Sequence, residues 1–165
     1  MTATKRSPHA RLPLRRFARE WALQYLYQLD VTGVEPSDSL LAAFWDQQGE
    51  VGTLQLGARE CRKCRETAET MIRGVLAHKP ELDQHIGRCA RNWDFARLAL
   101  IDRNLLRLAA YEIRHCPDVP PAVAIDEALE ICRVFGGGGE STAFLNGILD
   151  QIRRDCRPPD HAGAV

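Results

Sequence analysis

The feature that most constrains the fold is a helical repeat of apolar side chains along nearly the whole chain. Between residues 14 and 30, apolar side chains recur every four residues, at Phe17, Trp21, Tyr25 and Leu29. That spacing places one broad apolar stripe along a helix. No segment shows the convincing alternation of apolar and polar residues that is typical of a half-buried strand. The sequence therefore predicts an all-α fold.

Glycine and proline divide this pattern into about seven helices, which we expect to form two packed bundles. Thr32-Gly33 and Pro36 end the first helix, and Ser37 is a candidate N-cap for the second. Three glycines within residues 46–57 indicate a loop. Lys79-Pro80 is expected to break the next helix. The predicted division is a basic flexible tail at 1–13, helical subdomains at 14–79 and 80–157, and a disordered tail at 158–165.

Apolar seams on the later helices make up the rest of the expected core. The seams contain Cys61, Cys64, Ala68, Met71, Ile72 and Val75; Leu82, Ile86, Cys89 and Trp93; Ile101, Leu105, Leu108, Ala109 and Ile113; Ile125, Ala128, Leu129, Cys132 and Phe135; and Leu145, Ile148, Leu149, Ile152 and Cys156. Apolar residues make up 45% of the chain, which is enough for a real core.

Charge is distributed unevenly, although the formal net charge is +0. The first nineteen residues carry six basic side chains and no acidic one, whereas the remainder carries 16 basic and 22 acidic groups. A basic arm on an acidic body suggests that the arm meets a polyanion, and nucleic acid is the default choice. No apolar run approaches 18 residues, so we expect no membrane span.

The six cysteines are interpreted first as packing residues. Cys61 and Cys64 form a CxxC, but no second CxxC or paired histidine motif follows. Both lie on an apolar seam, and free cysteine behaves as a small buried hydrophobe. Metal binding and redox or disulfide roles stay open as lesser alternatives. Six cysteines without an export signal fit a reducing cytoplasm, which is the expected location.

No pattern in the chain predicts catalysis or a cofactor. The glycines at 136–139 lack the spacing of a dinucleotide-binding or P-loop motif, and a helix precedes them. They are interpreted as a helix cap followed by a turn, with close approach to RNA or protein as the alternative. The five histidines share no motif, and we expect a protein that is not an enzyme.

The start of the first helix is the candidate nucleic-acid contact. Arg15 and Arg19 are one turn apart, and Arg16 lies beside them, so all three are expected to project from one side. Guanidinium groups bind phosphate oxygens and stack on unpaired bases. Positive charge at a helix start opposes the helix dipole, which favours a functional reason for it. Leu23 and Tyr27 continue this row, either as an exposed contact or as packing residues.

Several blocks of sequence resemble the NusB family of transcription antitermination factors. The first is Arg15-Arg16-Phe17-Ala18-Arg19-Glu20, followed by Ala22, Gln24 and Leu26-Tyr27. The others are Asp102 to Ile113, Val119-Pro120 with Val123 to Ala128, Phe135-Gly136, and the block Phe144-Leu145-Asn146-Gly147-Ile148-Leu149-Asp150. The blocks occur in the family's order over roughly residues 15 to 152, and the ordered set is highly specific.

The resemblance implies two helical bundles and an adaptor without catalysis or cofactor. It implies binding of single-stranded boxA RNA from ribosomal RNA leaders, together with the ribosomal protein NusE. The complex would join RNA polymerase and other Nus factors and support read-through of ribosomal RNA operons. The implied RNA-binding residues are Arg15, Arg16, Arg19, Gln24, Glu140 and Phe144. The implied partner-binding residues are Leu23, Tyr27, Asp102 and Arg103.

Two alternatives remain at this stage. One is a helical RNA-binding module related to the N-terminal domains of ribosomal RNA methyltransferases, although this chain has no room for a cofactor-binding α/β domain. The other is a protein-only helical adaptor, which leaves the basic arm unexplained. Phe17 interrupts an arginine run that is unbroken in some relatives, so RNA affinity is expected to be lower. The sequence does not decide between a monomer and a homodimer.

Overall fold

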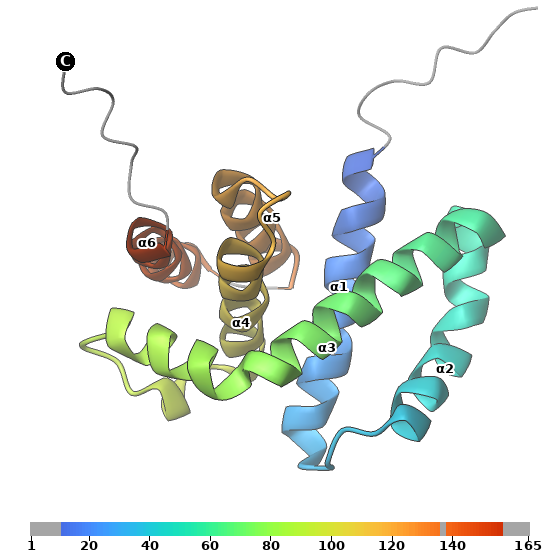
Figure 1. The fold of residues 1–165 in the computed structure, drawn as a ribbon, viewed down its shortest axis with the longest axis horizontal. Helices are drawn as coiled ribbons and strands as arrows, with labels where there is room; N and C mark the ends of the chain where they lie inside the picture. Colours follow the sequence, from blue (N-terminus) through green and yellow to red (C-terminus); the bar gives the residue numbers. More distant parts are fainter. Residues whose placement is uncertain (1–10, 136–137, 157–165) are drawn as a thin grey trace, which may run out of the picture. The chain divides into compact units, whose positions relative to one another are not determined.

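The computed structural model describes residues 11–135 and 138–156, and every regular element in these ranges is helical (Figure 1). The α-helices are α1 (Arg11–Thr32), α2 (Asp38–Leu56), α3 (Ala58–Cys89), α4 (Leu100–His115), α5 (Pro121–Val134) and α6 (Gly139–Cys156), with a 3₁₀ helix η2 (Phe95–Arg97). The all-α prediction is confirmed. No helix of this described part is long and apolar enough to cross a membrane.

Contacts divide the chain into two compact units, Met1–Arg73 and Gly74–Val165. The boundary falls inside α3, so this helix contributes its first half to unit 1 and its second half to unit 2. The division at residue 80 that the sequence suggested stays a prediction. The predicted tail at 158–165 lies outside the described residues, and α1 already begins at Arg11.

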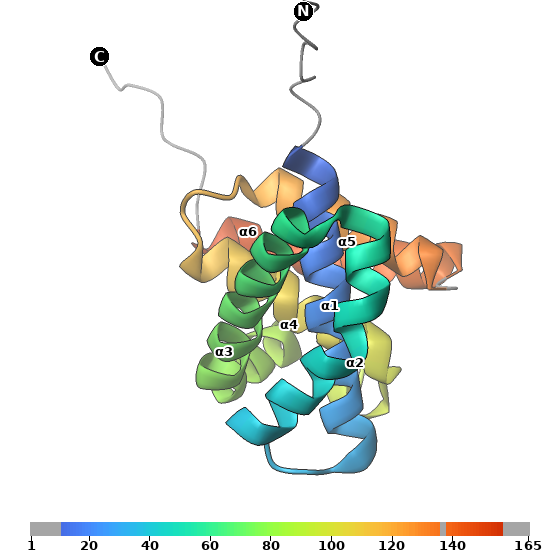
Figure 2. The same ribbon diagram turned by 90° about the vertical axis from the view of Figure 1, so that its right-hand side faces the viewer.

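Helices α1 and α2 lie side by side in unit 1 (Figure 2), and aromatic side chains pack between them. Trp21 meets Trp45 edge to face with the ring centroids 5.6 Å apart, and Tyr25 meets Phe44 in the same way at 5.3 Å. Such edge-to-face pairs add about 0.5–1.5 kcal/mol each to the free energy gained by burial. The buried thiol of Cys64 on α3 donates to the carbonyl oxygen of Leu14 at 3.1 Å, which also ties α3 to α1.

The turn between α1 and α2 forms where the sequence predicts it. Gly33 adopts φ 65°, a left-handed conformation that favours glycine, and its N–H donates to the carbonyl of Leu29 at 2.9 Å. At the start of α2, the hydroxyl of Ser37 accepts from the N–H of Leu40 at 3.2 Å. The prediction of Ser37 as an N-cap is confirmed.

Two predicted helix breaks are wrong. Residues 46–56 continue α2, and the turn is confined to Gly57, which has φ 80°. Interior glycines weaken a helix by about 1 kcal/mol each without ending it, and the residues between them are ordinary helix formers. The second expected break was at Lys79-Pro80, but α3 runs through Pro80 for 32 residues. The cost of the missing N–H is offset because Val75, Leu82 and Ile86 are fully buried on either side.

Helices α4, α5 and α6 pack against one another in unit 2 (Figures 1 and 2). Pro121 stands at the first position of α5, where its missing N–H costs nothing. The expected seams supply the core, which includes Leu105, Leu108, Ile113, Ala128, Leu145, Leu149 and Ile152. The glycines at 136 and 137 lie outside the described residues.

The predicted apolar seam of Leu82, Ile86, Cys89 and Trp93 differs from expectation at its end. Helix α3 stops at Cys89, so Trp93 lies beyond it and is 62% exposed. Phe135, expected on the α5 seam, is also exposed. All six cysteines are free thiols; Cys64 and Cys132 are buried, and the other four are half-buried.

Candidate nucleic-acid interface

The three arginines at the start of α1 do not share one exposed face. Arg16 is exposed, Arg15 is half-buried, and Arg19 is only 3% exposed. The expectation that all three project together is therefore wrong for Arg19. A guanidinium that is buried this deeply acts first within the fold, because its desolvation must be offset by contacts there. Arg16 is the arginine of the set with the side chain most open to a ligand.

Gln24 is held against α2 in unit 1. Its Oε1 accepts a hydrogen bond from Nε2 of Gln48 at 3.2 Å, and the side chain is half-buried. The amide orientation follows from this pairing. The bond fixes the rotamer of Gln24 but leaves its own amide donors available. Its assignment to RNA stays a prediction.

Leu23 and Tyr27, one turn apart on α1, have opposite environments. Leu23 is 2% exposed and belongs to the core, whereas the ring of Tyr27 is 40% exposed. The sequence left open whether this pair forms a contact surface or packs inside the fold. In the structure Leu23 packs inside the fold, and Tyr27 is on the surface. Tyr27 is the one that presents an aromatic surface to solvent.

In unit 2, Asp102 and Arg103 lie in the first turn of α4. Burial raises the pKa of the half-buried Asp102 carboxyl above its usual value of 3.8. A carboxylate in a first helical turn is also stabilised by the helix dipole. The guanidinium carbon of Arg103 lies 5.6 Å from the ring centroid of Phe95 in η2. A partner cation that reaches Asp102 would meet a carboxylate that is already partly desolvated.

Glu140 and Phe144 belong to α6 in the same unit. Glu140 is exposed in the first turn of that helix, and Phe144 is half-buried. The ring of Phe144 meets Trp93 edge to face with the centroids 5.0 Å apart. Trp93 is a candidate contact residue that sequence reasoning assigned to the core. The signal for its exposure was the polar and charged neighbourhood, Arg91-Asn92-Trp93-Asp94, although its spacing from Cys89 is helical.

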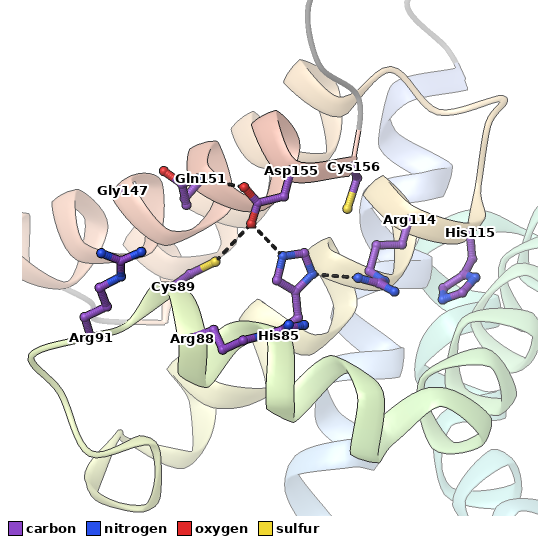
Figure 3. A pocket seen from close by; sticks show the side chains of 10 residues that line it. All are labelled: His85, Arg88, Cys89, Arg91, Arg114, His115, Gly147, Gln151, Asp155 and Cys156. Carbon is purple, nitrogen blue, oxygen red and sulfur yellow. Dashed lines mark hydrogen bonds and ion pairs between the residues drawn. The ribbon is translucent and has the colours of Figure 1, made fainter.

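A pocket of about 980 Å³ opens between the end of α3, the end of α4 and one face of α6 (Figure 3). Its lining is mostly polar and basic: His85, Arg88, Cys89, Arg91, Arg114, His115, Gly147, Gln151, Asp155 and Cys156. Arg91 and Gly147 lie at one end, and Arg114 and His115 at the other. All of these residues belong to unit 2. The sequence did not predict this pocket, because its basic residues are far apart in the chain.

The buried His85 stands at the centre of a hydrogen-bond chain in this pocket. Nη1 of Arg114 lies 2.7 Å from Nδ1 of His85, and Nε2 of His85 lies 2.9 Å from Oδ2 of Asp155 (Figure 3). A guanidinium only donates, so Nδ1 accepts and the ring proton of the neutral imidazole is on Nε2, from which it donates to Asp155. The bond from His85 lowers the pKa of the Asp155 carboxyl.

This tautomer disfavours a metal ion at His85, Cys89 and Asp155. Ligand atoms of these three residues lie within 4.8 Å of one another, as a cation site would require. However, the Nε2 atom that faces the other two carries the proton, and the Arg114 cation approaches the ring from its other side. Burial and the Asp155 carboxylate also raise the pKa of the Cys89 thiol to about 11, which keeps it protonated. The charges of the pocket suit an anion better than a cation.

The sequence model of the NusB family matches residues 16–154. This chain belongs to the NusB family. The matched range includes every predicted contact residue except Arg15. The family prediction that rested on the ordered sequence blocks is thereby confirmed.

Relatives of known name align with most of the length of this chain. The transcription antitermination protein NusB of Desulfotalea psychrophila is 41% identical over 147 residues, which cover 88% of this chain and 99% of that protein. The NusB of Anaeromyxobacter sp. is 42% identical over 141 residues, covering 86% and 90%. These relatives are named as antitermination proteins and not as enzymes, in agreement with the expectation of a non-catalytic protein.

Solved NusB structures share the fold. The NusB of T. maritima superposes with a TM-score of 0.72 at 33% identity, over 87% of this chain and 93% of that one. A complex described as the antitermination factors NusB and NusE with double-stranded RNA gives a TM-score of 0.71 at 21% identity, covering 87% and 98%. At that identity the second likeness concerns the fold alone.

Proposed function

We propose that this NusB family member is an RNA-binding antitermination adaptor that binds boxA RNA together with NusE and supports read-through of ribosomal RNA operons. The observation that carries the proposal is the basic start of α1, with Arg16 exposed, in a chain of this family. The complex is proposed to join RNA polymerase and other Nus factors. No covalent chemistry and no cofactor are needed for this role.

Each proposed contact has a distinct physical task. Arg16, with Arg15 beside it, attracts phosphate groups and releases counterions, which gives affinity without sequence preference. Preference for boxA comes from stacking and edge contacts to unpaired bases, for which Phe144 and the amide of Gln24 are the candidates. Arg19 contributes by holding the start of α1 in place, and Glu140 is a candidate for contact with base amino groups.

NusE is proposed to contact Tyr27 on unit 1 and Asp102 with Arg103 on unit 2. Tyr27 offers an exposed aromatic ring, and Asp102 offers a partly desolvated carboxylate. Leu23, which is buried in the core of unit 1, is not proposed to touch the partner. Because binding free energies are reciprocal, any gain in RNA affinity from NusE must be matched by an equal gain in NusE affinity from RNA.

The test is a binding titration with labelled boxA RNA, a scrambled single strand and a duplex of the boxA sequence, each with and without NusE across a salt series. The proposal expects boxA to bind most tightly as a single strand and to bind more tightly when NusE is present. Equal, purely salt-driven affinity for boxA and scrambled RNA in the presence of NusE would overturn it. Binding of NusE without any RNA binding would identify a protein-only adaptor.

A further inference from the structure

An exposed tryptophan marks unit 2 as a second place where a planar ligand could bind. Trp93 is 62% exposed, while Trp21 and Trp45 are 6% and 3% exposed. Its ring is supported from one side by the edge-to-face contact with Phe144. A large apolar ring that is held in place yet open to solvent is typical of a contact residue, because its burial by a ligand is favourable and costs little side-chain entropy.

The adjoining pocket carries an excess of positive charge. Its lining contains three arginines and one carboxylate, Asp155, so it bears a charge of about +2 with both histidines neutral. Asp155 already accepts from His85 and Gln151, and Arg114 is paired with Glu81. No ion pair links Arg88 or Arg91 to a carboxylate within the described ranges 11–135 and 138–156, and both side chains are exposed. These two guanidinium groups are therefore available to an anion.

The aromatic pair borders the end of the pocket at which Arg91 lies, whereas Arg88 lies nearer the middle of the pocket, beside His85 (Figure 3). Arg91 is two residues before Trp93, and Gly147 is three residues after Phe144, about one turn along α6. Figure 3 shows Arg91 and Gly147 at this end. A Cβ atom placed on Gly147 would have nothing within 4 Å, so the approach to the pocket is open there.

A guanidinium group beside an exposed aromatic ring, with a second guanidinium further along the pocket, matches a single-stranded nucleic acid, which offers successive phosphates and free base faces. A duplex hides its base faces, and an acidic peptide has no planar group at a fixed distance from its charge. We propose that unit 2 carries a subsite for single-stranded RNA, in which Trp93 stacks on a base, Arg91 holds the phosphate beside it, and Arg88 holds a further phosphate of the strand along the pocket. The inference rests on the proposed RNA-binding function, and it names a contact surface separate from α1.

Trp93 provides a direct readout of this subsite. Since the other two tryptophans are buried, quenching of fluorescence by an RNA dodecamer reports chiefly on Trp93. Single-stranded RNA of boxA or scrambled sequence is expected to quench, and the matching duplex is not. Trp93→Leu is expected to weaken single-strand binding about tenfold, and Trp93→Phe, which retains a stacking ring, to weaken it less. Equal quenching by the duplex would overturn the stacking role.

The phosphate contacts are tested by Arg88→Ala with Arg91→Ala. This double variant is expected to weaken single-strand binding at least fivefold and to reduce the salt slope by about 1.4. The matched control is Arg133→Ala with Arg154→Ala, which removes the same charge from unit 2 at arginines that pair with Glu130 and Asp150 and do not line the pocket. Inorganic phosphate, compared with chloride at equal ionic strength, should compete for the wild type more strongly than for the pocket variant.

The outcomes separate the subsite from the function on which it rests. If the wild type prefers boxA and responds to NusE, but the Trp93 and Arg88/Arg91 variants bind like their controls, the subsite is wrong and the proposed function stands. If those variants lose binding while the wild type shows no preference for boxA, the subsite stands and the antitermination proposal fails. Absence of any RNA binding by the wild type would overturn both. Melting temperatures are measured for all variants, to check that any loss of RNA binding is not caused by loss of the fold.

Discussion

The ring of Tyr111 on α4 lies directly over Gly74 on α3, so closely that a side chain at residue 74 has no space. A Cβ atom built on Gly74 would fall 2.1 Å from Cζ and 2.3 Å from the hydroxyl oxygen of Tyr111. Real Cβ atoms do not approach other atoms at such distances. The two residues join α3 to α4 inside unit 2, and the glycine is required by this close approach.

Gly74→Ala is expected to destabilise the protein by about 1–3 kcal/mol, because the methyl group forces Tyr111 out of its position. Chemical denaturation measures the loss. Gly87→Ala is the matched control in the same helix, since nothing lies within 4 Å of its Cβ position, and it is expected to be neutral or slightly stabilising. Combining Gly74→Ala with Tyr111→Ala should cost less than the sum of the two single changes. Additive losses of stability would show that the Tyr111 ring is not the reason why residue 74 must be glycine.

Asp83→Ala is expected to cost about 2–4 kcal/mol, because it removes two hydrogen bonds that a carboxylate accepts from a buried guanidinium. Both oxygens of Asp83 accept from Arg107, at 2.6 and 2.8 Å, and the Arg107 side chain is 5% exposed. Urea denaturation gives the value. Glu69→Ala, which removes the partner of the exposed Arg65, should cost less than about 0.5 kcal/mol. Similar losses of stability in the two variants would contradict the expectation that a buried ion pair matters more than an exposed one.

The buried thiol of Cys64 is expected to resist alkylation at pH 7.5. Burial, with the neighbouring Cys61 and Glu60, raises the pKa of this thiol from 9.0 to about 11. The thiolate fraction should be roughly a hundredfold or more below that of a free cysteine. Timed reaction with iodoacetamide, read by mass spectrometry in buffer and in urea, checks this. A rate in buffer equal to that in urea would contradict the expectation.

The same shift predicts how stability depends on alkaline pH. A pKa that is raised in the folded state contributes stability that is fully present below the unfolded value of 9.0 and is lost as the pH rises through about 11. Cys64→Ala should therefore flatten this part of the stability curve. If stability falls just as steeply at alkaline pH in that variant, the loss of stability comes from groups other than Cys64.

Tyr27→Asp and Leu23→Asp are expected to fail in different ways, although they place the same charge one turn apart on α1. Leu23→Asp buries an unpaired carboxylate and should destabilise the fold by about 3 kcal/mol or more. Tyr27→Asp should leave the melting temperature nearly unchanged and weaken NusE binding. Thermal melting and a NusE binding titration measure the two effects. Loss of cooperative melting in Tyr27→Asp would place Tyr27 in the core.

Arg16→Ala and Arg19→Ala should likewise separate RNA binding from stability. Removing the exposed Arg16 is expected to lower the slope of log affinity against log salt by about 0.7 for single-stranded RNA, with little change in stability. Removing the buried Arg19 should lower stability by about 1–3 kcal/mol, because its contacts inside the fold are lost. Salt titrations and denaturation curves are run on both. An unchanged slope for Arg16→Ala would show that this side chain is not a phosphate contact.

The helices were predictable where local chemistry decides them. The end of the first helix at Thr32-Gly33 and the cap at Ser37 depend on a few neighbouring residues, and both formed as expected. The period of four residues from Phe17 to Leu29 likewise identified α1. Pro80 misled the prediction, because its local cost is outweighed by the burial of residues on both sides of it, which the local sequence does not reveal.

The candidate site was only partly predictable for the same reason. Helical spacing places Arg15 and Arg19 on one side of α1, but burial of Arg19 depends on what packs there. Trp93 was assigned to a core seam because its spacing from Cys89 is helical, whereas α3 ends first. The pocket around His85 joins residues up to 71 positions apart in the chain, from His85 to Cys156, and spacing along a sequence carries no sign of such a meeting.

The boundary between the two units lies in the middle of α3 and not in a linker. Proteases cut preferentially in exposed backbone that can leave the fold, and a continuous helix with a buried face does not supply it. Limited proteolysis is therefore expected to cut the described part of this protein at the turns near Gly33 and Gly57, and not to release the two units as separate fragments. In the same way, dividing the chain between residues 73 and 74 and expressing the halves separately would leave each half with only part of α3.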